Sequence, residues 1–519
     1  MWMLGAVGVA FGGLGPMDVV VVYNAEDPDA VEVADAYRAA RSVPAAQACG
    51  LTGIDPAVAQ IDVPTFEASV RDPVEACLAA LPDPDEIDAM VTVRGLPYVV
   101  TLPTYVVGLE AALQVGRGTG PAGEIFGTPQ LDAAGYAQAS VPNPAFVGGY
   151  CAPGDLALSN PYAGWYASTC ALQALDLLPL GFDRRDPHAT GSYDLTGSLF
   201  VVTRLDGFDH ADALALIDRG VAADGAFPTA PVVCMAAADE ARGARDPECE
   251  LATRRLAEAG VPATWIAPYD PALSGIAVSA YFTGSADLRG AIDGVDYAPG
   301  AIVDNLTSYG AVPQNFVCDE ATGTCPASES QTSIARFVRA GATGVHGTVA
   351  EPLNNPFPTA GALVLYTAGY TLGESYLYAE QFLYWQNLVL GDPLTAPFAH
   401  RPVVTIPATA PAGGVLTVAA SHPDGVDGIA VYVDGVAVST DGTWVVDAPE
   451  GTALEVMAVA TAGATALDRP GWPLADGTQR ARPETRGWAT ATVTVGPPAD
   501  TTTGPPTGTT TTTATVDPT

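Results

Sequence analysis

The feature that most constrains the fold is a regular alternation of apolar strand-like runs and helical segments over residues 18–398. Residues 18–24 (DVVVVYN) form a run of valines that ends in turn residues, which is typical of a strand buried in a parallel sheet. Residues 30–41 follow with Val31, Ala34 and Tyr37 on one helical face. This segment therefore predicts a β-α unit.

The same pattern recurs along the chain. Further strands are predicted at residues 87–93, 200–203, 231–235, 276–282, 302–306 and 342–349, and further helices at 211–222 and 333–340. Parallel strands need long crossover connections, and helices supply them. We therefore predict an α/β domain over residues 16–400, with a mostly parallel sheet and helices on both faces. Two subdomains that divide near residue 195 are an open alternative.

The pattern changes at Arg401. Short β-rich runs follow at 402–406, 415–420, 428–433, 436–438, 443–446, 454–459 and 489–495. Asp434-Gly435 between two of them is a strong hairpin signal. We predict an all-β sandwich of immunoglobulin-like type over residues 401–496, without a disulfide of its own.

Both ends of the chain differ from these domains. Residues 1–15 are apolar and uncharged, as in the core of a signal peptide, and are too short to span a bilayer. Residues 497–519 are rich in Thr and Pro, which predicts a disordered stalk. We find no other apolar run of about 18 residues, so no transmembrane segment is expected.

The charge of the chain excludes several classes of function. The formal net charge is −37, and all 21 basic residues are Arg. A nucleic-acid partner needs a basic surface, and a Schiff-base or P-loop site needs a lysine. The acidity suits a secreted, periplasmic or cell-surface protein, although a coding bias toward Arg explains the missing lysine equally well. We expect a monomer without a cofactor.

Eight cysteines lie before residue 330 in local pairs. None has zinc-ligand spacing, so no metal site is predicted. Short loops favour four disulfides, although buried free thiols are the alternative. The predicted pairs are Cys49–Cys77, Cys151–Cys170, Cys234–Cys249 and Cys318–Cys325.

Candidate site residues follow the predicted strands. The carboxyl ends of parallel strands form the ligand-binding edge of an open sheet, so we expect these residues to converge. The binding candidates are Arg94, Arg204, Asp206, Ser285, Asp287 and Tyr309. For Arg204 and Asp206 the plainer interpretation is a structural ion pair.

A catalytic hypothesis rests on three residues. Ser308 follows a strand beside a glycine, as a nucleophile does, and His346 is a candidate base. Glu351 and Asp304 are the two candidates to orient the imidazole. The competing interpretations are a hydroxyl that stabilises a turn at Ser308 and a packed, hydrogen-bonded histidine at position 346.

Several strings in order carry a family resemblance. They are 19–44 (VVVVYNAEDPDAVEVADAYRAARSVP), 87–97 (IDAMVTVRGLP), 202–207 (VTRLDG), 281–288 (YFTGSADL), 299–311 (PGAIVDNLTSYGA), 339–352 (RAGATGVHGTVAEP) and 388–398 (LVLGDPLTAPF). By these strings the chain resembles a family of uncharacterised exported bacterial proteins, over about three quarters of its length. The resemblance brings no established activity.

A more distant similarity suggests a chemistry. The layout resembles gingipain-type cysteine peptidases, which have a caspase-like domain, a Gly-Asp-Pro closing element and an immunoglobulin-like domain. Gly391-Asp392-Pro393 fits the closing element. The strand that would bear the histidine ends in Thr283-Gly284-Ser285, and the strand that would bear the cysteine ends in Thr307-Ser308-Tyr309.

Both catalytic positions of that family are therefore changed. This departure predicts a pseudo-peptidase that binds an unknown peptide or glycan. The alternatives are an active extracellular hydrolase that uses Ser308 and His346, and a structural surface protein.

Overall fold

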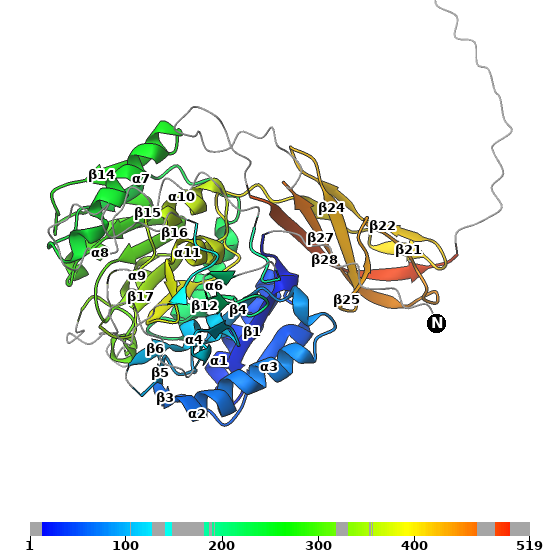
Figure 1. The fold of residues 1–519 in the computed structure, drawn as a ribbon. Coiled ribbons are helices and arrows are strands. Elements are labelled where there is room, and N and C mark those ends of the chain that lie inside the picture. The colour runs from blue at the N-terminus through cyan, green and yellow to red at the C-terminus, as the bar shows by residue number, and fades with distance from the viewer. Residues whose placement is uncertain are drawn as a thin grey trace, which may run out of the picture.

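The computed structural model describes residues 13–103, 105–126, 141–147, 181–185, 189–190, 192–317, 331–351, 354, 356–463 and 483–498. Its centre is a ten-stranded sheet (Figure 1). In spatial order the strands are β14 (Ala263–Ile266), β13 (Val232–Met235), β15 (Ile276–Thr283), β16 (Val295–Asn305), β17 (Gly344–Thr348), β19 (Asn387–Gly391), β12 (Val201–Leu205), β4 (Ala89–Val93), β1 (Val19–Asn24) and β2 (Ala48–Leu51).

The sheet is mostly parallel, as the sequence predicts. The pairs from β14 to β17 are parallel, and so are the pairs from β12 to β2. β19 joins these two groups and runs antiparallel to β17, with Gly344 opposite Gly391. The strands β1, β4 and β12 are almost wholly buried, which explains why they read as continuous apolar runs.

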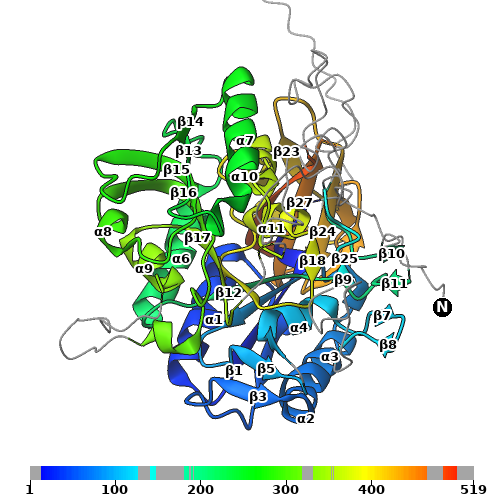
Figure 2. The same cartoon turned by 60° about the vertical axis from the view of Figure 1, so that its left-hand side comes forward.

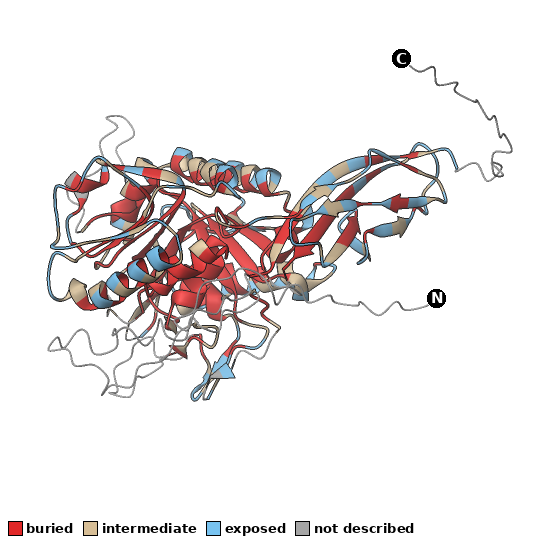
Figure 3. Cartoon of the chain, turned by 90° about the horizontal axis from the view of Figure 1, so that it is seen from above, coloured by how far each residue is buried: buried red, intermediate tan, exposed pale blue. Residues whose placement is uncertain are grey.

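Helices lie on both sides of this sheet (Figures 2 and 3). They are α1 (Pro28–Arg41), α2 (Val63–Phe66), α3 (Asp72–Ala79), α4 (Leu109–Val115), α6 (His210–Ala223), α7 (Asp246–Glu258), α8 (Arg289–Ile292), α9 (Ile334–Ala340), α10 (Gly361–Ala368) and α11 (Leu372–Ala379). α1 and α6 pack against each other, whereas α4 and α11 both pack on β12. The buried residues concentrate in the sheet between these layers (Figure 3).

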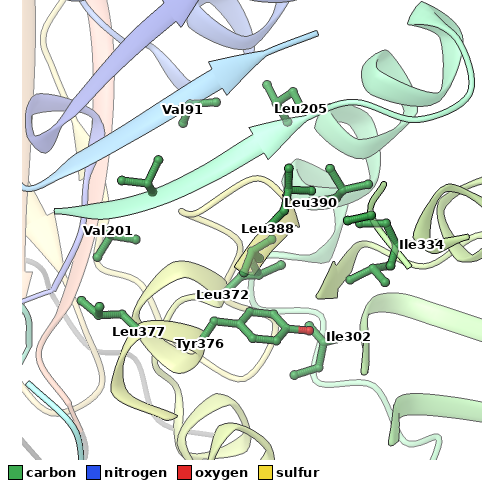
Figure 4. Packing of buried hydrophobic residues seen from close by; sticks show 14 of the residues in the cluster. Val91, Val201, Leu205, Ile302, Ile334, Leu372, Tyr376, Leu377, Leu388 and Leu390 are labelled. Atoms are coloured by element: carbon green, nitrogen blue, oxygen red, sulfur yellow. The ribbon is translucent and has the colours of Figure 1, made fainter. Parts of the chain in front are cut away.

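The core is continuous across the sheet. Figure 4 shows Leu372 and Tyr376 of α11 packed near Leu388 of β19. The ring of Tyr376 is fully buried, and its hydroxyl donates to the carbonyl of Val303 at 3.0 Å. A polar atom of this core helix is therefore satisfied by the sheet itself.

Short strands extend the domain. β3 (Gln60–Asp62), β5 (Val99–Thr101) and β6 (Val106–Gly108) form one small sheet, and β7 (Thr119–Gly120), β8 (Gly123–Glu124), β10 (Ala189–Thr190) and β11 (Tyr193–Asp194) form another. β9 (Val141–Pro142) pairs with β18 (Phe382–Leu383).

The described part of the chain beyond residue 402 contains strands and no helices. A five-stranded sheet has the order β21 (Thr409–Pro411), β28 (Thr485–Gly496), β27 (Ala453–Ala462), β24 (Gly428–Val433) and β25 (Val436–Ser439). Two further pairs are β20 (Val403–Thr405) with β23 (Ala419–Ser421), and β22 (Val415–Thr417) with β26 (Thr443–Val445). The β24–β25 turn has φ of 50° at Asp434 and 78° at Gly435, which is the hairpin that the sequence predicts.

A buried ion pair joins the two regions. Arg486 of β28 donates to Asp18 at 2.6 Å, and both residues are buried. Arg401 donates to the carbonyl of Arg486 at 2.7 Å and lies over the ring of Trp488. The all-β region is therefore held against the start of β1 by charge-assisted bonds.

Gly391-Asp392-Pro393 anchors the end of the large sheet to a helix. Asp392 is fully buried, and it accepts hydrogen bonds from the hydroxyl of Tyr37 at 2.9 Å and from Nε of Arg41 at 2.5 Å. Arg41 also donates to Asp224, which follows α6. The Asp392 carboxylate therefore fastens α1 to the end of β19.

Of the two predicted disulfides whose cysteines the structure describes, one is present. Cys49 of β2 and Cys77 of α3 are bonded. Cys234 and Cys249 are free and buried, so the predicted Cys234–Cys249 disulfide is wrong. Both lie on core-facing positions of β13 and α7, and burial raises the pKa of the Cys234 thiol well above its usual range. The predicted pairs Cys151–Cys170 and Cys318–Cys325 lie outside the described residues, as do residues 1–12 of the signal-like segment and 499–519 of the stalk.

No helix among the described residues has the length and apolar character needed to cross a membrane.

Breaking the Asp392 anchor tests its contribution. Asp392→Asn leaves the buried guanidinium of Arg41 with less opposing charge, so we expect a loss of about 3–5 kcal/mol in the free energy of unfolding, measured by urea titration. The control is Asp35→Asn, which removes an exposed i,i+3 partner of Arg38 and should cost no more than about 1 kcal/mol. Equal costs for the two variants would contradict the assignment.

The cysteine assignment predicts an alkylation pattern. After unfolding without reductant, iodoacetamide should modify Cys234 and Cys249 and leave Cys49 and Cys77 unmodified. Peptide mass mapping reads the result directly. A peptide linked through Cys234 and Cys249 would show that the disulfide predicted from the sequence is correct and that these cysteines are not free thiols.

Candidate functional site

The strand ends of both halves of the sheet meet at one edge. The ring of Tyr98, after β4, lies 4.9 Å from the ring of Phe316, which follows β16. The Tyr98 hydroxyl donates to Asp206, after β12, at 2.8 Å. We call the segments that follow β4, β12, β13, β15, β16 and β17 the strand-end edge. It is where the sequence places the candidate residues.

Arg204 and Asp206 are satisfied within the protein. Arg204 is fully buried, and it donates to Glu110 at 3.0 Å and to Asp206 at 2.9 Å. It also donates to the carbonyls of Leu96 and Pro97, and its guanidinium lies 4.0 Å from the centre of the Tyr98 ring. The pair is therefore a structural ion pair, the plainer of the two interpretations.

Arg94 is partly exposed at the same edge. It donates to Asp29 at 2.8 Å and lies 3.8 Å from Asp206. Asp29 in turn lies 3.6 Å from Nδ1 of His210, at the start of α6. Arg94 thus bridges the ends of β1, β4 and β12 and keeps part of its surface in contact with solvent.

Hydrogen bonds from side chains of the protein interior fix the segment that follows β15. Ser285 is buried; its hydroxyl accepts from Tyr269 at 2.9 Å and donates to the carbonyl of Asp287 at 3.2 Å. The side chain of Asn305 bonds both the N–H and the carbonyl of Ser285. Ser285 thus supports the loop, whereas Asp287 lies at the surface.

Ser308, Tyr309 and Glu351 form an outward-facing group. The Ser308 hydroxyl donates to Oε1 of Glu351 at 2.9 Å. Tyr309 has φ of 60°, an uncommon backbone conformation for a bulky residue. Partial burial and the Glu351 carboxylate both raise the pKa of its phenol. These three side chains link the ends of β16 and β17.

His346 lies beneath this group and has no exposed surface. Its Nδ1 is 2.8 Å from Oδ2 of Asp304, which is also fully buried. Asp304 accepts from Arg245 at 2.7 Å through its other oxygen. The rings of Phe357 and Tyr376 flank the imidazole at 5.1 and 6.3 Å. His346 is therefore a packed histidine of the core that lies within ion-pair distance of Asp304, although neither ring nitrogen makes a hydrogen bond to a described residue.

The structure brings Ser308 and Glu351 together, and of the two candidates to orient His346 it places Asp304 beside the imidazole. A general base must reach the proton that it removes, and a fully buried imidazole held by Asp304 is not presented to a substrate. Of the three predicted catalytic residues, Ser308 and Glu351 therefore form a pair at the surface, whereas His346 is buried.

Sequence reasoning missed Arg242 and Arg245. Arg242 donates to Thr307 at 3.2 Å and to Gln331 at 3.0 Å, and so joins the segment after β13 to the segments after β16 and before α9. Arg245 donates to the carbonyls of Thr283 and Asp304 as well as to the Asp304 carboxylate. Both residues precede α7 and have no local motif, so only the three-dimensional arrangement reveals their roles.

Buried acids near this network have raised pKa values. Burial raises the pKa of Glu248, in α7, to about 8, and that of Glu380, after α11, to about 7. Both carboxyl groups therefore keep their proton to a higher pH than an exposed glutamate does. No group of three or more metal-ligating side chains is found in the part of the chain that the structure describes.

Comparisons with known proteins give a structural likeness and no sequence relative. No protein-family model and no curated protein matches the chain. A solved structure described as "Structure of Protease" is similar with a TM-score of 0.42 and 12% sequence identity, over 92% of this chain and 97% of that chain. The function is therefore argued from the residues of this chain.

Glu248 gives the network a measurable pH dependence. Its pKa is about 4.5 in the unfolded chain and about 8 when folded, so unfolding releases a proton between these values. This group therefore lowers the free energy of unfolding as pH rises from 5.5 to 8. In Glu248→Gln, we expect the loss over that range to be smaller by about 2–3 kcal/mol, measured by urea titration at several pH values. The exposed neighbour Glu250→Gln should keep the wild-type slope; an unchanged slope in Glu248→Gln would contradict the assignment.

Proposed function

We propose that this chain is a non-catalytic, caspase-like binding protein whose strand-end edge holds a peptide. The observation that carries the proposal is the burial of His346 against Asp304. A cysteine or serine peptidase needs an accessible imidazole beside its nucleophile. At the two strand ends where the gingipain-type resemblance implies a histidine and a cysteine, this chain has Thr283-Gly284-Ser285 and Thr307-Ser308-Tyr309.

The exposed groups of the edge suggest which peptide it takes. Asp239, Asp287 and Glu351 are exposed on the segments that follow β13, β15 and β17, and the Asp239 carboxylate accepts from Arg242 at 2.6 Å. Tyr309 adds an aromatic ring beside Glu351. Carboxylates next to an aromatic face favour a guanidinium or ammonium group, so we propose a segment with a basic side chain. A glycan is the other ligand class that the sequence suggests.

We further propose that the protein is exported. The Cys49–Cys77 disulfide, the net charge of −37 and the apolar residues 1–15 support this compartment. The sequence strings support membership in the family of uncharacterised exported proteins that the chain resembles. The short paired strands beyond residue 402 support an immunoglobulin-like sandwich.

A second candidate function is favoured by one contact. The hydroxyl of Ser308 donates to the Glu351 carboxylate at 2.9 Å, which is the hydrogen bond that a serine nucleophile makes with its base. In this alternative the protein is a hydrolase, and Glu351, rather than His346, removes the proton.

Matched peptides test the binding proposal. We expect acetyl-Gly-Tyr-Arg-Gly-amide, labelled with a fluorophore, to bind more tightly than the same peptide with Gln in place of Arg, as measured by fluorescence anisotropy. Glu351→Gln should lower the affinity for the Arg peptide by about fivefold to tenfold, since one charge-assisted hydrogen bond is lost.

The control separates a site from general attraction to an acidic protein. Glu258→Gln removes an exposed carboxylate at the far end of α7 and should leave the affinity unchanged. If Glu351→Gln and Glu258→Gln weaken the binding of the Arg peptide equally, the proposed site is contradicted. Binding of oligosaccharides without binding of either peptide would also contradict it.

A further inference from the structure

An apolar cavity of about 320 Å³ lies at the opposite edge of the sheet, where β4 and β12 begin. It lies between α3, α4 and the segment that leads into β12. Its apolar lining includes Val74, Leu78, Met90, Leu113 and Phe200. Small-molecule sites are concave and mostly apolar, with a few polar groups that orient the ligand.

Arg184 is the polar group that stands out in this lining. The residue is 8% exposed, and its guanidinium lies 4.9 Å from the centre of the Phe200 ring. It donates to the carbonyls of Pro84 and Gly197. Its carboxylate contact is Asp85, at 3.5 Å, whose side chain is 75% exposed.

One donor of Arg184 has no protein partner. Nε is buried and makes no hydrogen bond. A buried donor without an acceptor costs free energy, which a ligand oxygen would recover. Burial also lowers the pKa of Arg184, the direction expected for a cation whose charge is incompletely compensated.

The other arginines of the cavity are already paired. Arg71 donates to Glu67 at 2.9 Å and to Glu124 at 2.8 Å. Arg117, at the mouth, donates to Glu75 at 2.6 Å. Arg184 is thus the lining cation that an incoming anion would neutralise.

We propose that this cavity binds an organic carboxylate with an apolar body, such as a medium-chain fatty acid. The carboxylate accepts from Arg184, and the hydrocarbon lies against Met90, Leu113 and Phe200. Charge-assisted hydrogen bonds fix the head group, and removal of the chain from water supplies the remaining affinity. This site is separate from the strand-end edge and does not depend on the peptide-binding proposal.

A pair of probes tests the head group. Isothermal titration calorimetry with decanoate should show saturable binding to the full chain below about 1 mM. Decanol has the same chain without the charge, so it should bind at least tenfold more weakly. Equal affinity for decanoate and decanol, or no saturable binding of decanoate, would overturn the proposal.

Variants locate the binding. Arg184→Gln should weaken decanoate binding at least tenfold and leave decanol binding nearly unchanged. Ala112→Phe fills the cavity from α4 and should abolish binding of both. Arg254→Gln, an exposed residue of α7 that does not line the cavity, should keep the wild-type affinity.

Circular dichroism confirms that each variant is folded. If Arg184→Gln does not fold, Ala112→Phe and the comparison of the two probes decide the question. Wild-type affinity for decanoate in a folded Ala112→Phe variant would overturn the proposal, since the ligand would then bind elsewhere.

Discussion

The buried contact among Arg245, Asp304 and His346 is the interaction on which the strand-end edge depends. Asp304 of β16 and His346 of β17 have no exposed surface, and Arg245 comes from the segment before α7. These three groups lie together in the core, where the guanidinium of Arg245 compensates the buried carboxylate of Asp304. They also fasten the ends of β15, β16 and β17 together, since Arg245 reaches the carbonyls of Thr283 and Asp304. His346 therefore has a structural role and is not available as a general base.

Polar side chains at the strand-end edge fall into two groups, one that points into the protein and one that points toward solvent. Arg204, Asp206 and Ser285 turn inward and hold loops in place. Ser308 and Glu351 turn outward and pair with each other. The inward group gives the outward group a rigid support, which is what a binding surface needs if it is to hold a ligand without large ordering costs. The Asp392 anchor stabilises the opposite edge in the same way, through Tyr37 and Arg41 of α1.

The local sequence pattern predicted the strands and the hairpin well, but it predicted the contacts between distant residues poorly. The valine run of β1 and the Asp434-Gly435 turn carry their structure within a few residues, so strand and hairpin were predictable. Cys49–Cys77 was found by proximity in sequence, but the same rule failed for Cys234–Cys249, because it does not register that both side chains face the core. The Arg245–Asp304 pair joins residues 59 positions apart, and Ser308–Glu351 joins residues 43 apart. Such pairs have no local signal, so the sequence could nominate Ser308 and Glu351 but not their pairing.

The central claim is that the strand-end edge holds a ligand and performs no acyl transfer. Intact-mass spectrometry after treatment with a fluorophosphonate tests it most directly, because an activated serine is phosphonylated and a hydrogen-bonded surface hydroxyl is not. The account predicts no adduct on the folded protein at neutral pH, while a known serine hydrolase in the same tube is modified completely. A single adduct that maps to Ser308 and disappears in Glu351→Gln would contradict the account and establish a hydrolase.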